Sequence, residues 1–326
     1  MMMMIKMLKT ATDNLVPTLN LANAEATGEG LAALDEACRN HGFFLLQNHG
    51  LDRAIEAMWQ ASEDFFKQPQ ASKRALKRTE SSPLGYFDQE MTKRQRDLKE
   101  VFDFMRPSAS GRNLNQWPDD EAFKQTLSDF FEAASRVAHR TLALVYQALA
   151  ADSSDALPMG DPATSTVRLN FYPTQDPLPA NERAQAGVLG NMALHHHTDP
   201  GILTLLLQDL TGGLQTLTQD QHWIDVPPQA GTIVVNLGDA MQVWSNDAYR
   251  AAIHRVTPRD RSARYSTPYF YNPKSDAVLA PITHLTQDPP HFRPFTWREY
   301  IKGRVDDNFT DLGVDDIQID RFRIAV

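Results

Sequence analysis

The sequence predicts a mainly β fold with helical support, an α+β chain in which the second half forms an antiparallel barrel or jelly roll. Short β-rich segments follow one another after about residue 164, each bounded by Gly, Pro, Asp or Asn turn residues. No helical stretches of about 10 to 15 residues lie between them, as parallel βαβ units would require. The segments are TVRLNFYP, ILTLLLQ, GGLQTLT, HWIDVPP, GTIVVNLGD, IHRVTP and RYSTPYFYNP.

The first half, over about residues 1–160, is expected to be mostly helical with short strands. Apolar residues recur there at helical spacings, most clearly in 120–151, and this pattern is typical of a helix that packs on a core. These elements would support the jelly roll as a buttress. They are a short strand over 16–21, a helix over 26–40, a buried strand over Phe43–Leu46, and helices over 51–67 and 120–151.

No internal repeat and no low-complexity linker divides the chain, so we expect one domain over 1–326. The jelly-roll core would occupy about 164–285, and a tail over about 286–326 would include a helix near TWREYIKGRV. Residues 174–194 are rich in Pro, Gly and Asn. They are expected to form either a lid near the mouth of a site or a flexible loop.

The net charge of −9 argues against nucleic acid and acidic membrane surfaces as partners, because both need clustered cations. The one basic run, KRALKRTESS with MTKRQRDLKE after it, alternates with acids and is expected to be a solvated helical face. The start of the chain lacks the features of a secretory signal, and no apolar run is long enough to span a bilayer. We therefore expect no membrane partner.

Cys38 is the only cysteine. An intramolecular disulfide is therefore impossible, and a reducing, cytoplasmic location is expected. Because Cys38 lies in an apparent amphipathic helix, a buried structural thiol is expected rather than a nucleophile.

The strongest candidate site lies in HHHTDPG, where His197 and Asp199 are two positions apart. On a strand this spacing points both side chains to one face, so that a ring nitrogen and a carboxylate oxygen can bind the same ion. His195 would share that face and competes with His197, whereas His196 would point away. His254, on another expected strand, can supply a third ligand. Two histidines and one carboxylate leave three adjacent positions of an octahedral iron open, which is the facial triad of nonhaem Fe(II) oxygenases.

Arg264 and Ser266 follow His254 by ten and twelve residues, on one face of one expected strand. Arginine can bind a carboxylate bidentately, and a serine hydroxyl can share it. A buried cation beside a metal site therefore suits a dicarboxylate whose other end chelates the ion.

Together these stretches resemble the 2-oxoglutarate/Fe(II)-dependent dioxygenases of the isopenicillin N synthase-like superfamily. The resemblance covers about residues 15–305, and the combination of motifs is more specific than any one of them. It implies a distorted double-stranded β-helix, which is a jelly roll with helical support. The matching stretches are GFFLLQNHGL, GYFDQE with RDLKEVFDF after it, RLNFYP, HTDPGILTLLLQD, GGLQ, VPPQAGTIVVNLGDAMQVWSN, HRV and RYS.

The resemblance also implies ligands for Fe(II) and for the cosubstrate 2-oxoglutarate. Oxidative decarboxylation of 2-oxoglutarate with O2, to succinate and CO2, would be coupled to hydroxylation, desaturation or cyclisation of a small organic substrate. The residues that the resemblance assigns are His197, Asp199 and His254 for Fe(II), and Arg264, Ser266, Tyr172 and Asn170 for 2-oxoglutarate.

Other positions refine what the resemblance implies. Halogenating relatives replace the carboxylate with a small residue, so Asp199 disfavours halogenation. Ala252 stands where members often have serine, which is expected to alter hydrogen bonding near the metal without abolishing metal binding. Tyr86, Phe87 and Phe270 are expected to line the substrate pocket.

Three alternatives stay open. An oxidase of the isopenicillin N synthase or aminocyclopropane carboxylate oxidase type uses the same triad without 2-oxoglutarate and keeps an arginine and a serine like Arg264 and Ser266. Only Tyr172 favours 2-oxoglutarate over this type. A noncatalytic jelly-roll binding protein and a zinc hydrolase are less favoured, the hydrolase because Arg264 would lack a role. The expected partner is a small-molecule substrate, and the expected assembly is a monomer or weak homo-oligomer.

Overall fold

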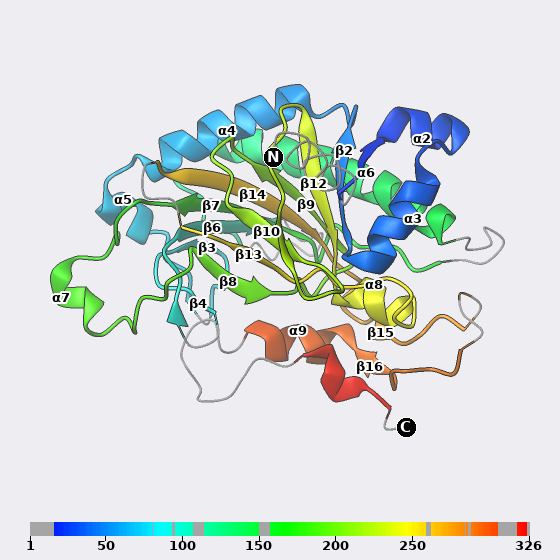
Figure 1. Cartoon of the computed structure of the whole chain (residues 1–326). Coiled ribbons are helices and arrows are strands. Elements are labelled where there is room, and N and C mark those ends of the chain that lie inside the picture. The colour runs from blue at the N-terminus through cyan, green and yellow to red at the C-terminus, as the bar shows by residue number, and fades with distance from the viewer. Residues whose placement is uncertain are drawn as a thin grey trace, which may run out of the picture.

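Two β-sheets of unequal size face each other in the middle of the molecule (Figure 1). The computed structural model describes residues 16–79, 81–92, 95–106, 114–149, 157–258, 262–283, 285, 288–305 and 318–324. In spatial order, the large sheet contains β1 (Thr18–Asn20), β2 (Phe43–Gln47), β12 (Thr232–Leu237), β9 (Leu203–Gln208), β14 (Arg264–Tyr271), β7 (Thr166–Tyr172), β6 (Glu100–Met105) and β3 (Gly85–Phe87). The small sheet contains β11 (Trp223–Asp225), β10 (Leu214–Leu217), β13 (His254–Val256) and β8 (Leu194–His197).

The expected fold class, mainly β with helical support, is confirmed. Each β-rich segment expected after residue 164 forms a strand, and the neighbours β12, β9, β14 and β7 pair antiparallel in the centre of the large sheet. The N-terminal part contributes more to the sheet than a buttress would, because β1, β2, β3 and β6 extend it on both sides. The expected strands over 16–21 and Phe43–Leu46 are β1 and β2.

Two long helices cover the outer face of the large sheet, α4 (Asp52–Phe66) and α6 (Glu121–Ala148) (Figure 1). Their apolar stripes bury Phe65, Leu127 and Phe130 in the main core, and each such side chain contributes roughly 1.5–3 kcal/mol. The side chain of Asp120 accepts a hydrogen bond from the Phe123 amide at 3.0 Å and caps the start of α6. The helices expected over 51–67 and 120–151 are confirmed in the described residues.

The prediction of a single helix over 26–40 is wrong, because two helices occupy this region, α2 (Leu21–Thr27) and α3 (Leu31–Asn40). Gly28 ends α2 in the left-handed conformation, with φ 71°, and its amide donates to Ala24 O at 2.9 Å. A residue in this conformation cannot continue a right-handed helix. The glycines of TGEG therefore break a pattern that looks continuous in apolar spacing.

Shorter elements complete the fold. The helix expected near TWREYIKGRV is confirmed as α9 (Trp297–Val305), which lies below the two sheets in Figure 1. None of the helices in the described ranges is both long and apolar enough to cross a bilayer. Cys38 is buried in α3, as expected, and its burial raises the pKa of the thiol. The remaining elements are α5 (Gln70–Arg74), α7 (Ala180–Arg183), α8 (Asp239–Trp244), α9 (Trp297–Val305), a 3-10 helix (Ile319–Phe322), and the strand pairs β4 (Met91–Thr92) with β5 (Gln95–Arg96) and β15 (Val278–Leu279) with β16 (Phe295–Thr296).

The prediction that the basic run is a solvated helical face is wrong. Lys73, Arg78, Arg96 and Lys99 are all buried, and each pairs with an acid from a neighbouring segment. Lys73 Nζ, for example, lies 2.5 Å from Glu100 Oε2. Buried cations persist only when they are paired. Two of these acids, Glu90 and Glu100, lie next to the run or within it, but only the fold brings each of them against its cation.

Candidate metal centre

A cavity of about 240 Å³ lies between the two sheets and contains the predicted site. Strands β8 and β13 of the small sheet and strands β7 and β14 of the large sheet supply its walls. The sequence placed these residues on separate expected strands, and the fold brings them into one space. All seven residues predicted for Fe(II) and 2-oxoglutarate line it: Asn170, Tyr172, His197, Asp199, His254, Arg264 and Ser266.

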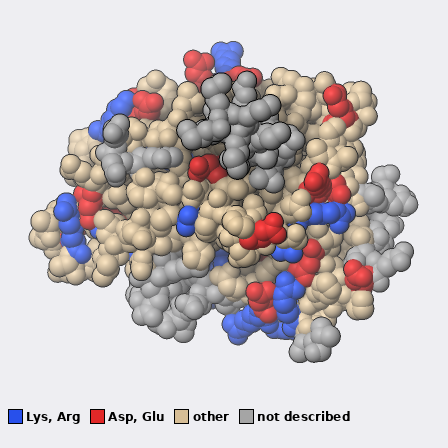
Figure 2. All heavy atoms as spheres, viewed as in Figure 1, with Lys and Arg blue, Asp and Glu red and all other residues tan. Residues whose placement is uncertain are grey.

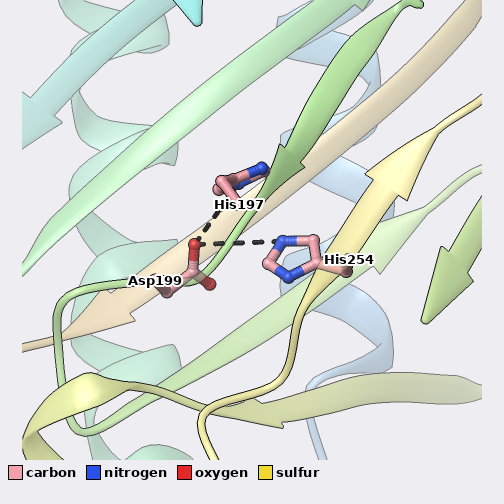
Figure 3. Close-up of side chains that lie close together, drawn as sticks. All are labelled: His197, Asp199 and His254. Carbon is pink, nitrogen blue, oxygen red and sulfur yellow. Dashed lines mark ion pairs between the residues drawn. The ribbon is translucent and has the colours of Figure 1, made fainter. Parts of the chain in front are cut away.

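The triad His197, Asp199 and His254 comes together at one end of the small sheet (Figure 3). His197 ends β8 and His254 begins β13, and the two residues pair directly across the antiparallel strands. Asp199 Oδ1 lies 3.7 Å from Nε2 of His197 and 3.9 Å from Nε2 of His254. The potential ligand atoms lie within 4.8 Å of one another. This is the set of two histidines and one carboxylate that suits nonhaem iron.

Both imidazoles are turned so that Nε2 faces the carboxylate. His197 Nδ1 lies 2.8 Å from His195 O, and His254 Nδ1 lies 2.9 Å from Ala252 O. A backbone carbonyl only accepts, so Nδ1 carries the proton and Nε2 keeps a lone pair for a metal. Burial and the neighbouring His254 lower the pKa of His197 to about 3, so this ring is neutral. The contact at Ala252 uses the backbone, so it does not depend on a serine side chain there.

The carboxylate of Asp199 is held from behind by two polar side chains that sequence reasoning missed. Its Oδ2 accepts hydrogen bonds from Thr204 Oγ1 at 2.5 Å and from Asn236 Nδ2 at 2.8 Å. Burial alone would raise the pKa of this carboxyl, but the two histidines and these hydrogen bonds hold it below its ordinary value. Oδ1 therefore stays directed toward the histidines. A single polar residue inside each apolar strand, LTLLLQ and TIVVNL, is a signal that could have identified both residues.

The loop that carries Asp199 depends on a close approach of two backbones. Asp199 O accepts from the Asp239 amide at 2.8 Å, and Gly201 O accepts from the Ala240 amide at 3.0 Å. A Cβ atom at Gly238 would lie only 2.4 Å from Gly201 O. The motifs DPG and LGD are therefore parts of one contact that fixes the position of the carboxylate.

Replacement of Thr204 by valine is expected to weaken Fe(II) binding by roughly 10- to 100-fold. Valine keeps the shape but removes the hydroxyl that orients Asp199, so the carboxylate loses one of its two donors. Anaerobic titration with Fe(II) measures the effect. Thr267→Val is the matched control, because this buried threonine contacts Met58 and does not line the cavity. An equal loss of affinity in both variants would contradict the orienting role.

The three consecutive histidines have different surroundings. His195 is buried, and its Nδ1 lies 2.9 Å from Asp97 Oδ1. Its ring is not among the groups that line the cavity. His196 is exposed and meets the edge of Trp223, with ring centroids 6.3 Å apart. Within the described residues, the metal-ligand cluster includes His197 and neither of its two neighbours.

Arg264 lines the same cavity as the triad. The register of β14 and β7 sets Arg264 opposite Tyr172 and Ser266 opposite Asn170. The guanidinium carbon lies 5.0 Å from the centre of the Tyr172 ring, and Nε donates to Gly212 O at 3.0 Å. Arg264 is 2 % exposed, and its Nη1 has no hydrogen-bond partner. Among the described residues no carboxylate forms an ion pair with it, so this buried cation fits an anionic ligand.

The expected pocket residues divide into two groups. Phe270 lines the cavity, whereas Tyr86 and Phe87 do not. Tyr86 donates to Glu100 Oε2 at 2.6 Å and packs against Phe65 under α4. The contact with Phe65 places Tyr86 on the helix side of the sheet, and strand alternation places Phe87 on the other face, where its ring packs against Arg78. The expectation for Tyr86 and Phe87 is therefore wrong.

Ion pairs and a backbone hydrogen bond hold the segment 174–194 beside the cavity. Arg96 pairs with Asp176, and Arg74 Nη1 lies 2.9 Å from Glu182 Oε1 in the short helix α7. The Gly190 amide donates to Arg96 O at 2.9 Å. Only its last residue, Leu194, lines the cavity.

Comparison with known proteins agrees with this geometry. Residues 163–273 match the 2OG-Fe(II) oxygenase superfamily, and residues 16–120 match the family described as non-haem dioxygenase in morphine synthesis N-terminal. The 2-oxoglutarate-Fe(II) type oxidoreductase hxnY of Emericella nidulans is 31 % identical over 294 residues, which cover 82 % of this chain and 81 % of that protein. The 1-aminocyclopropane-1-carboxylate oxidase 4 of Solanum lycopersicum is 30 % identical over 295 residues, with 88 % of each chain covered.

A solved structure has a similar fold. A full-length Neurospora crassa protein, crystallised in complex with alpha-KG and 5-formyluracil, superposes with a TM-score of 0.74 and 25 % identity, over 88 % of this chain and 94 % of that one. The chain therefore belongs to the 2-oxoglutarate/Fe(II) oxygenases of the isopenicillin N synthase-like superfamily. It is a 2-oxoglutarate- and Fe(II)-dependent dioxygenase that uses O2 and acts on a small organic substrate.

Proposed function

We propose that His197, Asp199 and His254 bind Fe(II) through Nε2, Oδ1 and Nε2. Support comes from the convergence of these three atoms and from the hydrogen bonds that fix each side chain from behind. Neutral imidazoles and an ionised carboxylate are the protonation states that a metal requires. The chemistry of the donor set therefore fits iron.

Arg264 binds the distal carboxylate of 2-oxoglutarate, with Ser266 and Tyr172 beside it and Asn170 next to Ser266. One observation carries this assignment: a buried guanidinium with an unpartnered Nη1 lines the same cavity as the triad. Asn170 Nδ2 lies 3.4 Å from Ser266 Oγ, so the serine hydroxyl is free to rotate toward a bound anion. A dicarboxylate in this cavity would extend from Arg264 toward the triad.

Bound Fe(II) and 2-oxoglutarate supply the oxidising chemistry, in which O2 is consumed, succinate and CO2 form, and a substrate C–H bond is hydroxylated. The residues of the chain orient the side chains that would bind these groups. Thr204 and Asn236 fix the carboxylate of Asp199, and the carbonyls of residues 195 and 252 fix the two rings. The position between the two sheets would limit the access of bulk water to the bound groups. Hydroxylation, desaturation and cyclisation differ in how the substrate is held.

The assignment is tested by the products. Purified enzyme with Fe(II), 2-oxoglutarate and O2 is expected to release succinate, faster in the presence of a substrate pool and not at all without iron. The similarity to an aminocyclopropane carboxylate oxidase keeps the 2-oxoglutarate-independent oxidase as a second candidate. Oxygen consumption with ascorbate but without 2-oxoglutarate, and no succinate under any condition, would favour that candidate and contradict the first.

The surroundings of the enzyme are proposed to be a reducing cytoplasm, with one oxygenase domain over 1–326 acting as a monomer or weak homo-oligomer. Burial of the single thiol, Cys38, is compatible with this. Nucleic acid and membranes are not proposed partners. Figure 2 shows one face on which basic and acidic side chains are interspersed, and clustered cations are what those partners require.

A further inference from the structure

A second cavity, of about 390 Å³, adjoins the metal cavity and shares five lining residues with it: Thr166, Arg168, Phe270, Asn272 and Ile301. We propose that this joint space binds the substrate, that the substrate carries no net charge, and that Arg168 donates a hydrogen bond to an oxygen acceptor on it. The inference rests on the proposed function, because the metal cavity must hold Fe(II) and 2-oxoglutarate. The combined size suits a small molecule.

Arg168 is the charged residue best placed to contact a substrate. It lies on the cavity face of β7, two positions before Asn170, and it lines both cavities. Its side chain is 21 % exposed, compared with 3 % for Lys99 and 4 % for Glu90. Nε and Nη2 donate to Asp103 at 2.6 and 2.8 Å, and Nη1 donates to Glu90 Oε2 at 2.9 Å. Nη1 carries two hydrogens, so one is left for an acceptor in the cavity.

The charges around Arg168 are balanced within the protein. Lys99 Nζ lies 2.7 Å from Glu90 and 3.4 Å from Asp97, and Arg78 reaches Glu90 at 2.6 Å and Asp103 at 2.8 Å. Three cations thus face three carboxylates in one buried network. The pKa of Glu90 lies well below its ordinary value despite burial, because Arg168, Lys99 and Arg78 surround it. The network leaves no net charge to neutralise a charged substrate.

The rest of the cavity is balanced as well. With Fe(II) and 2-oxoglutarate bound, the positive charges of the metal and Arg264 would balance the negative charges of Asp199 and the dianionic cosubstrate. On the α9 side, Arg304 donates to Thr198 O at 2.7 Å and interacts with the buried carboxyl of Asp239. Arg298 is at the exposed end of the second cavity, where solvent screens it. A buried, unpaired charge on a substrate would therefore be strongly disfavoured.

Apolar side chains line part of the remaining surface, beside uncharged polar residues such as Thr166 and Asn272. Phe270 contributes to both cavities, Pro268 to the inner one and Trp297 to the outer one. Ile301 of α9 lies across from them and also contributes to both. These groups suit an apolar ring or hydrocarbon body whose polar group reaches Arg168. The substrate class is therefore an uncharged compound with a carbonyl-type oxygen and an apolar body.

Matched acid and amide probes test the charge preference. The wild-type enzyme is loaded with Fe(II) and 2-oxoglutarate without O2, and binding is measured by calorimetry for benzamide against benzoate and for cyclohexanecarboxamide against cyclohexanecarboxylate. Each amide is expected to bind at least tenfold more tightly than its acid at neutral pH. Equal or tighter binding of the acids, or binding of neither member of each pair, would overturn the proposal. Binding of 2-oxoglutarate is measured first, and its failure would instead overturn the proposed function.

Arg168→Lys tests the residue. Lysine keeps the charge but cannot make the forked contacts and still donate to the cavity. The amide affinity is expected to fall at least tenfold, while the affinity for 2-oxoglutarate stays within twofold. Arg140→Lys is the matched control, because Arg140 pairs with Glu25 on the surface. Unchanged amide binding in Arg168→Lys would contradict the role of Arg168, and the wild-type comparison does not depend on how this variant folds.

Discussion

Replacement of His197 by alanine is expected to weaken Fe(II) binding by at least about 100-fold, because loss of a direct ligand exceeds the 10- to 100-fold effect typical of groups behind the ligands. The variant keeps Asp199 and His254 within reach of each other but removes one of the three convergent atoms. Anaerobic titration with Fe(II), followed by metal analysis of the desalted protein, measures the loss. Succinate formation is expected to fall in parallel.

The two neighbouring histidines supply unusually close controls. His196→Ala changes an exposed ring outside the cavity, and Fe(II) affinity is expected to stay within about threefold of the parent. His195→Ala keeps the backbone carbonyl that accepts from His197, so iron binding is again expected to persist. It leaves Asp97 without the contact to this ring, which is expected to lower the free energy of unfolding by roughly 1–3 kcal/mol. Loss of iron in His196→Ala as large as in His197→Ala would contradict the assignment.

Replacement of Arg264 by glutamine is expected to raise the Kd for 2-oxoglutarate by roughly 100-fold, the effect of removing one partner from a buried charge pair. Fe(II) affinity is expected to change little, because no triad residue contacts the guanidinium in the described structure. Calorimetric titration of the anaerobic Fe(II) enzyme with 2-oxoglutarate separates the two effects. Glutamine is close enough in size to limit loss of packing against Tyr172.

Arg106→Gln is the matched control for this experiment. Arg106 pairs with Glu132 on the surface, and such exposed pairs contribute little to stability. Its 2-oxoglutarate affinity is expected to equal that of the parent. If Arg264→Gln also left this affinity unchanged, the anion would bind elsewhere and the proposed anchor would be wrong.

The strands of the second half were predictable because each is short, β-rich and bounded by turn residues. The triad was predictable for a related reason, since His197 and His254 each lie on such a strand. Asp199 is a different case. The argument from a shared strand face named a residue that does lie in the cluster, yet β8 ends at His197, and Asp199 lies in the following loop. Its carboxylate is positioned by contacts with Thr204 and Asn236 rather than by strand alternation.

Long-range pairing could not be predicted from the linear sequence. The prediction of one helix over 26–40 was wrong because Gly28 adopts a left-handed conformation, which interrupts a continuous apolar pattern. The prediction for the basic run was wrong for a different reason, because composition alone suggests that Arg78 and Lys99 are exposed to solvent. Their burial depends on Glu90, which the fold brings beside both cations. Side-chain charge predicts exposure only when no opposite charge is available in the core.

The position of iron tests the central claim most directly. Crystals grown without O2 in the presence of Fe(II) and 2-oxoglutarate can be measured on both sides of the iron absorption edge. The anomalous difference map is expected to show one peak in contact with His197 Nε2, Asp199 Oδ1 and His254 Nε2, and 2-oxoglutarate density is expected to reach from that peak to Arg264. A peak bound by His195 or His196, or a 2-oxoglutarate carboxylate away from Arg264, would contradict it.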